Sequence, residues 1–75
     1  MRSTDNIIRI INHSNSNSSL IIDGTDKSTD NLIRIAKACV SKKIHLTVKV
    51  GDEHSTDNVI RLVKSGSDYI TIELL

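Results

Sequence analysis

Apolar residues follow two different periodicities along this chain, and the first of them comes after a phrase that occurs three times. The phrase Ser-Thr-Asp-Asn begins at Ser3, Ser28 and Ser55. Apolar residues follow it at positions i, i+1, i+3 and i+4, which places them on one broad stripe of a helix and does not fit a strand. The three stripes are Ile7, Ile8, Ile10 and Ile11; Leu32, Ile33, Ile35 and Ala36; and Val59, Ile60, Leu62 and Val63.

The repeated phrase also carries residues that start helices. Its serine stands just before the apolar stripe, where the hydroxyl can accept a hydrogen bond from a free amide of the first turn. Its aspartate comes two places later and suits the positive end of the helix dipole. We therefore expect three helices that begin directly after Ser3, Ser28 and Ser55.

The second periodicity is an alternation of apolar and polar residues, which predicts strands with one apolar and one polar face. It is clearest in residues 44–50 and 69–74. The first unit is shorter, with a polar loop at 15–19, a brief strand at 20–22 and a turn at Asp23-Gly24. The apolar faces consist of Leu20 and Ile22; Ile44, Leu46, Val48 and Val50; and Ile70, Ile72 and Leu74.

This order of elements predicts an α/β fold made of three helix-strand repeats, approximately residues 3–27, 28–54 and 55–75, in a single domain 1–75. Strands joined through a helix are expected to run parallel with right-handed crossovers. The prediction is a two-layer, solenoid-like unit: a three-stranded parallel sheet of order 1-2-3 with all helices on one face. The repeat lengths, 28 − 3 = 25 and 55 − 28 = 27, resemble those of leucine-rich repeats, but the Leu-x-x-Leu-x-Leu-x-x-Asn signature is absent.

The composition bears on the core and on partners. Among the 75 residues there is no Phe, Trp or Pro, and Tyr69 is the only aromatic residue, so the core is expected to be aliphatic. Ten basic and nine acidic residues give a net charge of +1, and the charges are dispersed along the chain. This composition argues against a nucleic acid or a membrane as the partner. The N-terminal residues have the pattern of neither a secretory signal nor a membrane span, so the expected location is cytoplasmic.

No group of residues has the pattern of a catalytic or metal site. The three histidines lack the spacing of a zinc site, and the last of them, His54, follows Asp52 and Glu53 in what we interpret as a solvated turn. Cys39 is alone in the chain and is predicted to be a small buried apolar residue. No serine lies in a nucleophile motif. We therefore predict no enzymatic activity, no cofactor and no metal.

One arginine in each stripe, at Arg9, Arg34 and Arg61, is expected to point away from the core. The simplest interpretation is a solvated face on which each arginine pairs with the aspartate four residues before it in the same helix. The alternative is an anion or nucleic-acid binder in which the row of arginines acts together with the helix N-termini. The near-neutral charge and the aspartate at each helix start favour the first interpretation.

The polar side of the sheet is the main candidate interaction surface. It would combine hydroxyl, charged and aromatic groups on a flat platform, which suits protein recognition with Tyr69 as the anchor. The same pattern also fits a sheet face that is merely solvated. The candidate residues are His45, Thr47, Lys49, Tyr69, Thr71 and Glu73, with Ile21 if the first strand keeps its register.

The third predicted strand has no following unit to pair with, so it is expected to leave backbone donors and acceptors free at its edge. The sequence therefore predicts a small non-enzymatic protein-interaction module. Its simplest form is a homodimer that joins at the open sheet face or at this edge strand, and another protein is the alternative partner.

Overall fold

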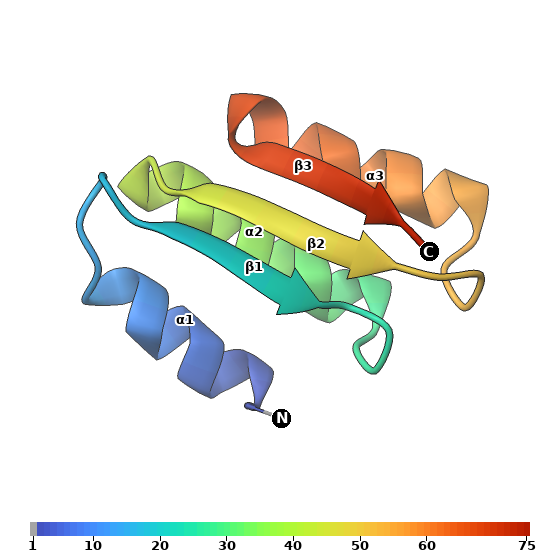
Figure 1. Cartoon of the computed structure of the whole chain (residues 1–75), viewed down its shortest axis with the longest axis horizontal. Coiled ribbons are helices and arrows are strands. Elements are labelled where there is room, and N and C mark those ends of the chain that lie inside the picture. The colour runs from blue at the N-terminus through green and yellow to red at the C-terminus, as the bar shows by residue number, and fades with distance from the viewer. Residues whose placement is uncertain (1) are drawn as a thin grey trace.

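A computed structural model describes residues 2–75, which form three helices and a three-stranded parallel sheet (Figure 1). The helices are α1 (Thr4–Asn12), α2 (Thr29–Lys42) and α3 (Thr56–Gly66), and a short 3₁₀ turn, η1 (Ser67–Tyr69), follows α3. The strands are β1 (Ser19–Asp23), β2 (His45–Val50) and β3 (Ile70–Leu74), in the order β1-β2-β3. The predicted mixed α/β class and parallel sheet order are confirmed.

All three helices begin where the repeated phrase predicts. Ser3, Ser28 and Ser55 adopt the extended N-cap conformation. Each hydroxyl oxygen accepts a hydrogen bond from the backbone amide three residues later, at 3.1, 3.2 and 3.2 Å respectively. Such a cap stabilises a helix by about 1 kcal/mol relative to alanine. The three helix starts therefore follow from contacts within a single turn of chain.

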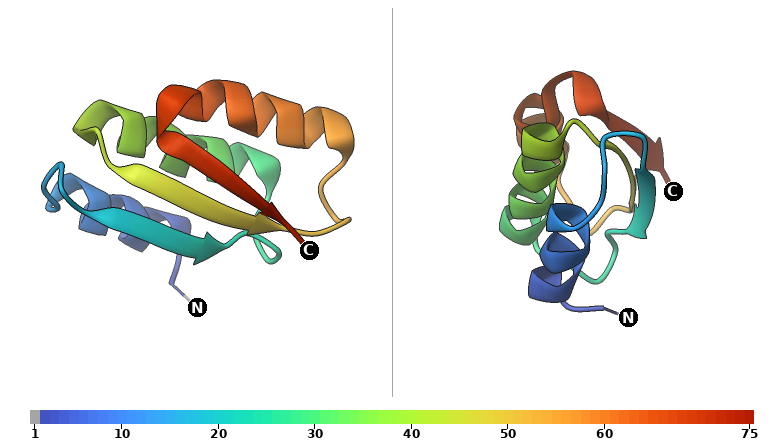
Figure 2. Two further views of the ribbon diagram at one scale, coloured as in Figure 1. Left: turned by 45° about the horizontal axis from the view of Figure 1, so that its top comes forward. Right: turned by 90° about the vertical axis from the view of Figure 1, so that its left-hand side faces the viewer.

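The helices lie on one side of the sheet, and the other side is open (Figure 2). The strands pair in register, so equivalent residues form rows that cross the whole sheet. Because side chains alternate along a strand, every second row faces the helices. The helix-facing rows include Leu20, Leu46 and Ile70, and Ile22, Val48 and Ile72.

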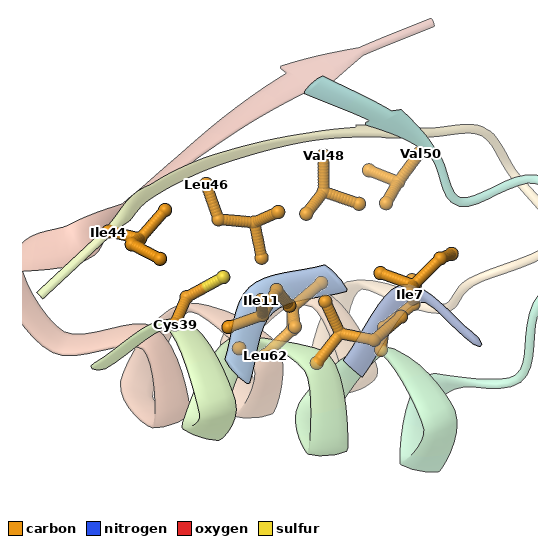
Figure 3. Close-up of a cluster of buried hydrophobic side chains, with 11 residues drawn as sticks. Ile7, Ile11, Cys39, Ile44, Leu46, Val48, Val50 and Leu62 are labelled. Carbon is orange, nitrogen blue, oxygen red and sulfur yellow. The ribbon is translucent and has the colours of Figure 1, made fainter. Parts of the chain in front are cut away.

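The core lies between the central strand and the helices. The apolar side chains of β2 and of Ile44 just before it are at most 1% exposed, and Figure 3 shows them pointing toward Ile7, Ile11, Cys39 and Leu62. Fully burying such a side chain is worth about 1.5–3 kcal/mol. The inward side chains of β1 and β3 are only partly buried. The centre of the molecule is thus covered more completely than its two sides.

The apolar stripes of the outer helices, α1 and α3, are only partly covered by the rest of the molecule. Ile10 on α1 is 40% exposed, and Ile60 and Val63 on α3 are 46% and 42% exposed. The stripe of α2, by contrast, is buried or partly buried throughout, because α2 has a helix on each side. Leu74, predicted on the apolar face of its strand, is 75% exposed at the end of β3.

The chain turns sharply between α3 and β3. Gly66 ends the helix, and a Cβ atom added there would lie 2.5 Å from Cβ and Cγ2 of Ile70, so only glycine fits this approach without movement. Tyr69 was predicted to belong to the last strand, but it closes η1, and β3 begins one residue later. No helix within residues 2–75 is long and apolar enough to cross a membrane.

Candidate interaction surfaces

The open side of the sheet has a centre of one isoleucine and two threonines. Ile21, Thr47 and Thr71 lie opposite one another in register. Ile21 is 70% exposed, so β1 keeps the register that the sequence analysis required for it to join this surface. His45 Nε2 lies 2.7 Å from Thr71 Oγ1, which adds a side-chain hydrogen bond between β2 and β3.

A charged row crosses the sheet one pleat further along. Asp23, Lys49 and Glu73 are in register, so a carboxylate on each outer strand flanks the central ammonium. The hydroxyl and the backbone amide of Thr25 donate to Asp23 Oδ1 at 2.6 and 2.9 Å. These bonds, with a smaller contribution from Lys49, hold the pKa of the Asp23 carboxyl below its ordinary value. Two carboxylates and one ammonium leave this row with one net negative charge.

The remaining candidate, Tyr69, lies in η1 beside the start of β3 and is partly buried. It borders the open face instead of standing in one of its strand rows. The five other predicted residues are in or next to the two strands β2 and β3, at positions that alternate with the buried ones. The structure therefore brings together most of the predicted surface, including Ile21, which was expected there only if β1 kept its register.

The predicted arginine row is exposed, but the predicted pairing within each helix is wrong. Arg34 Nη2 on α2 lies 2.8 Å from Asp5 Oδ1 on α1. Arg61 Nη2 on α3 lies 3.0 Å from Asp30 Oδ1 on α2. The cause is the arrangement of the helices. Neighbouring helices lie side by side and begin at the same end of the molecule, so the long arginine side chain reaches the aspartate of the preceding helix. Each Nη1 also donates to the asparagine three residues earlier.

Both ion pairs lie at the surface. More than half of each arginine side chain is open to solvent, as are 80% and 82% of the aspartates. Pairs of this kind contribute about 0.2–1 kcal/mol. Within residues 2–75, Arg9 of α1 has no carboxylate partner and Asp57 of α3 has no basic partner. The two outer helices therefore carry the unpaired members of this arrangement.

The role of His54 was not predicted from the sequence. This side chain is only 8% exposed, although Asp52 and Glu53 before it are exposed. Its Nε2 lies 2.9 Å from the Gly24 carbonyl oxygen, and its Nδ1 lies 2.9 Å from Thr29 Oγ1. A carbonyl only accepts, so Nε2 donates, and in the neutral ring Nδ1 then accepts from the Thr29 hydroxyl. The interpretation as a solvated turn is wrong for His54, because its ring is buried and its partners, Gly24 and Thr29, lie far back along the chain.

Cys39 is buried as predicted, at 1% exposed. Burial raises the pKa of its thiol to about 11, so the reactive thiolate is disfavoured in the folded chain. Among residues 2–75, no three His, Cys, Asp or Glu side chains gather closely enough to hold a metal ion.

The chain matches no protein-family model, no curated protein and no solved structure. A function must therefore be argued from its own surfaces. The features that stand out are the open sheet face and the apolar side chains that the outer elements leave uncovered.

Proposed function

We propose that this chain is a non-enzymatic protein-interaction module that associates with itself. The observation that carries the proposal is the apolar surface that the fold leaves uncovered: six large aliphatic side chains are between 40% and 75% exposed. Ile10 and Ile21 line one hollow, and Ile60, Leu74 and Leu75 line another. Apolar side chains grouped at the surface in this way commonly mark interaction sites. The six residues are Ile10, Ile21, Ile60, Val63, Leu74 and Leu75.

Two kinds of surface are available for this association. The open face around Ile21 belongs to a parallel sheet, and parallel sheets are normally covered on both faces. The outer edges of the sheet present unpaired backbone donors and acceptors, which favour pairing with another chain. In this proposal the three helix-strand units form a solenoid-like repeat, and a homodimer is the smallest assembly that would cover either surface. We place the module in the cytoplasm, where a single thiol such as Cys39 stays reduced.

The contacts of the polar residues support binding over catalysis. The three cap serines accept hydrogen bonds from helix amides, and the Cys39 thiol is buried. The anion-binding alternative has less support, because Arg34 and Arg61 already have carboxylate partners. An aspartate also lies in the first turn of each helix, where it would repel an incoming anion.

Light scattering across a wide concentration series, with reductant present, tests the proposal. We expect the mass of the wild-type chain to rise above that of a monomer. Ile21→Lys and Thr71→Lys each place a charge on the open face, and Ser41→Lys places the same charge at an exposed site on α2 as the control. A lower mass in both face variants, with the control unchanged, assigns association to the open face. Ile21 also lines the hollow beside β1, so a lower mass in Ile21→Lys alone, or an unchanged mass in both variants, assigns association to the edges. A wild-type chain that is monomeric throughout the series contradicts the proposal.

A further inference from the structure

Equivalent positions on the three helices differ in burial according to helix order. Ile10, Ile35 and Leu62 stand at equivalent positions in the apolar stripes that follow the repeated phrase. Ile35 is 0% and Leu62 is 1% exposed, whereas Ile10 is 40% exposed. α2 and α3 each have a preceding helix beside them and α1 has none. This position therefore faces the preceding helix, and on α1 it faces solvent.

The next position shows the reverse pattern. Ile11 is 0% and Ala36 is 1% exposed, but the equivalent Val63 on α3 is 42% exposed. α1 and α2 are each followed by another helix, and within residues 2–75 α3 is not. This position therefore faces the following helix. The outer side of α1 and the outer side of α3 are thus the two halves of the contact that joins successive helices.

The charges on the two outer helices are complementary in the same sense. Between neighbouring helices the arginine of the later helix reaches the aspartate of the earlier one, as in Arg34 with Asp5. This leaves Arg9 on α1 and Asp57 on α3 without such a partner in the described part of the chain. Arg9 lines a hollow on the outer side of α1 together with Arg2, so this side is basic. An Arg9 brought beside the Asp57 of another copy would repeat the existing pair.

The two edge strands of the sheet could pair with one another between copies in the same way. Register joins Leu20 to Leu46 and Leu46 to Ile70, and all three strands run parallel. A β1 strand placed beside the free edge of β3 in this register would set a second Leu20 opposite Ile70. Each edge has an apolar groove between its strand and its helix. One groove includes Ile7, Ile10, Leu20, Ile21 and Ile22, and the other includes Val59, Ile60, Leu74 and Leu75.

We propose that copies of this chain join head to tail, with the α3–β3 end of one copy bound to the α1–β1 end of the next. The contact repeats the one that already joins successive helix-strand units within the chain, including the arginine–aspartate pair and the parallel strand register. This inference rests on the proposed self-association and names its surfaces and its partner, a second copy. Because the two surfaces differ, the contact leaves a free end on each copy, and growth continues until a ring closes or a filament forms.

Two lysine variants that each block one end test this geometry. Ile10→Lys blocks the α1–β1 end and Val63→Lys blocks the α3–β3 end. Both sites are about two-fifths exposed in the single chain, so the fold should tolerate lysine, which circular dichroism verifies. Each variant alone should be monomeric, because every copy lacks the same end. An equimolar mixture should form a one-to-one dimer and nothing larger, since each variant retains the end that the other lacks.

The outcomes separate this inference from the proposed function. If the single variants associate as the wild type does while Thr71→Lys lowers the mass, the head-to-tail contact is overturned and the interaction module stands. If the single variants are monomeric but their mixture is too, the pairing of these two ends is overturned. A wild-type chain that never exceeds the mass of a monomer contradicts both. Ser41→Lys, an exposed site on α2 away from the two grooves, should behave as the wild type does.

A charge exchange tests the ion pair separately. Arg9→Glu and Asp57→Arg should each weaken association severalfold, because each sets like charges against one another across the contact. The double variant carries the exchanged pair and should recover affinity close to that of the wild type. A double variant as weak as the sum of the single ones would show that these two residues do not meet.

Discussion

His54 joins the turn before α3 to the turn before α2. Its ring contacts the Thr29 hydroxyl and the Gly24 carbonyl, both at 2.9 Å, in a site with little solvent. Lys27 holds the same place before its own cap serine, and its Nζ donates to the Arg2 carbonyl at 2.9 Å. At the residue scale, the side chain that precedes a cap serine therefore links successive units, with a different chemical group each time.

His54→Ala should lower the free energy of unfolding by about 1–3 kcal/mol, because it leaves the Thr29 hydroxyl without its partner in a buried site and the Gly24 carbonyl with only the longer bond from the Lys27 amide, at 3.3 Å. Urea unfolding followed by circular dichroism measures the change. His13→Ala is the matched control: His13 is exposed and its ring makes one contact, with the Arg9 carbonyl. Its loss should be below about 1 kcal/mol. Equal losses in the two variants would contradict a structural role for His54.

Two helices are followed by C-cap residues with positive φ that are not glycine. The C-cap of α2 is Lys43, with φ 58° and ψ 41°, the left-handed conformation common at helix C-termini. The C-cap of α3 is Ser67, with φ 52° and ψ −129°, a region that residues with a Cβ atom seldom adopt. At the element scale, the tight turn from α3 through η1 into β3 therefore holds Ser67 under strain.

Ser67→Gly should raise the free energy of unfolding by about 1 kcal/mol. Relief of backbone strain, about 1–3 kcal/mol, exceeds the extra entropy that glycine loses on folding, about 0.5–1 kcal/mol. Ser41→Gly makes the same change at an exposed position of α2, where it should destabilise the chain by a few tenths of a kcal/mol. Thermal unfolding compares the two variants. Destabilisation by both would show that Ser67 is not strained.

The whole molecule is organised around its central strand and helix. Ile44, Leu46 and Val48 are 0% exposed, and the Cys39 thiol, at 1%, lies among them. The inward residues of β1 and β3 are less covered. Because Cys39 belongs to the best-covered part of the core, its thiol reaches water only when the core opens. Its ionisation therefore reports on unfolding of the whole chain.

Stability should fall as the pH rises from about 9 to about 11. Burial raises the pKa of the Cys39 thiol from 9.0 to about 11, so in this interval the unfolded chain has lost a proton that the folded chain retains. The free energy of unfolding then decreases with pH, by an amount on the order of 2 kcal/mol. Cys39→Ala lacks this group, so its stability should decrease less over the same interval. Urea unfolding at several pH values measures both, and parallel decreases would exclude the thiol as the cause.

The local features of this chain could be predicted because they depend on near neighbours. Ser28 caps α2 through an amide three residues away, and the alternation in 44–50 suffices to divide β2 into a buried and an open face. The contacts of His54 and Arg34 could not be predicted in this way. Their partners lie 25 and 29 residues earlier in the chain, and no local periodicity indicates which atoms meet over such separations.

The sequence by itself determined the helix starts, the strand alternation and, through the helix between each pair of strands, a parallel sheet of order β1-β2-β3. Only the tertiary structure decided which of the repeated positions are covered. Ile10, Ile35 and Leu62 stand at equivalent positions in the three apolar stripes, yet they are 40%, 0% and 1% exposed. Burial depends on the presence of a neighbouring helix, which is a property of the order of the helices and not of the residue.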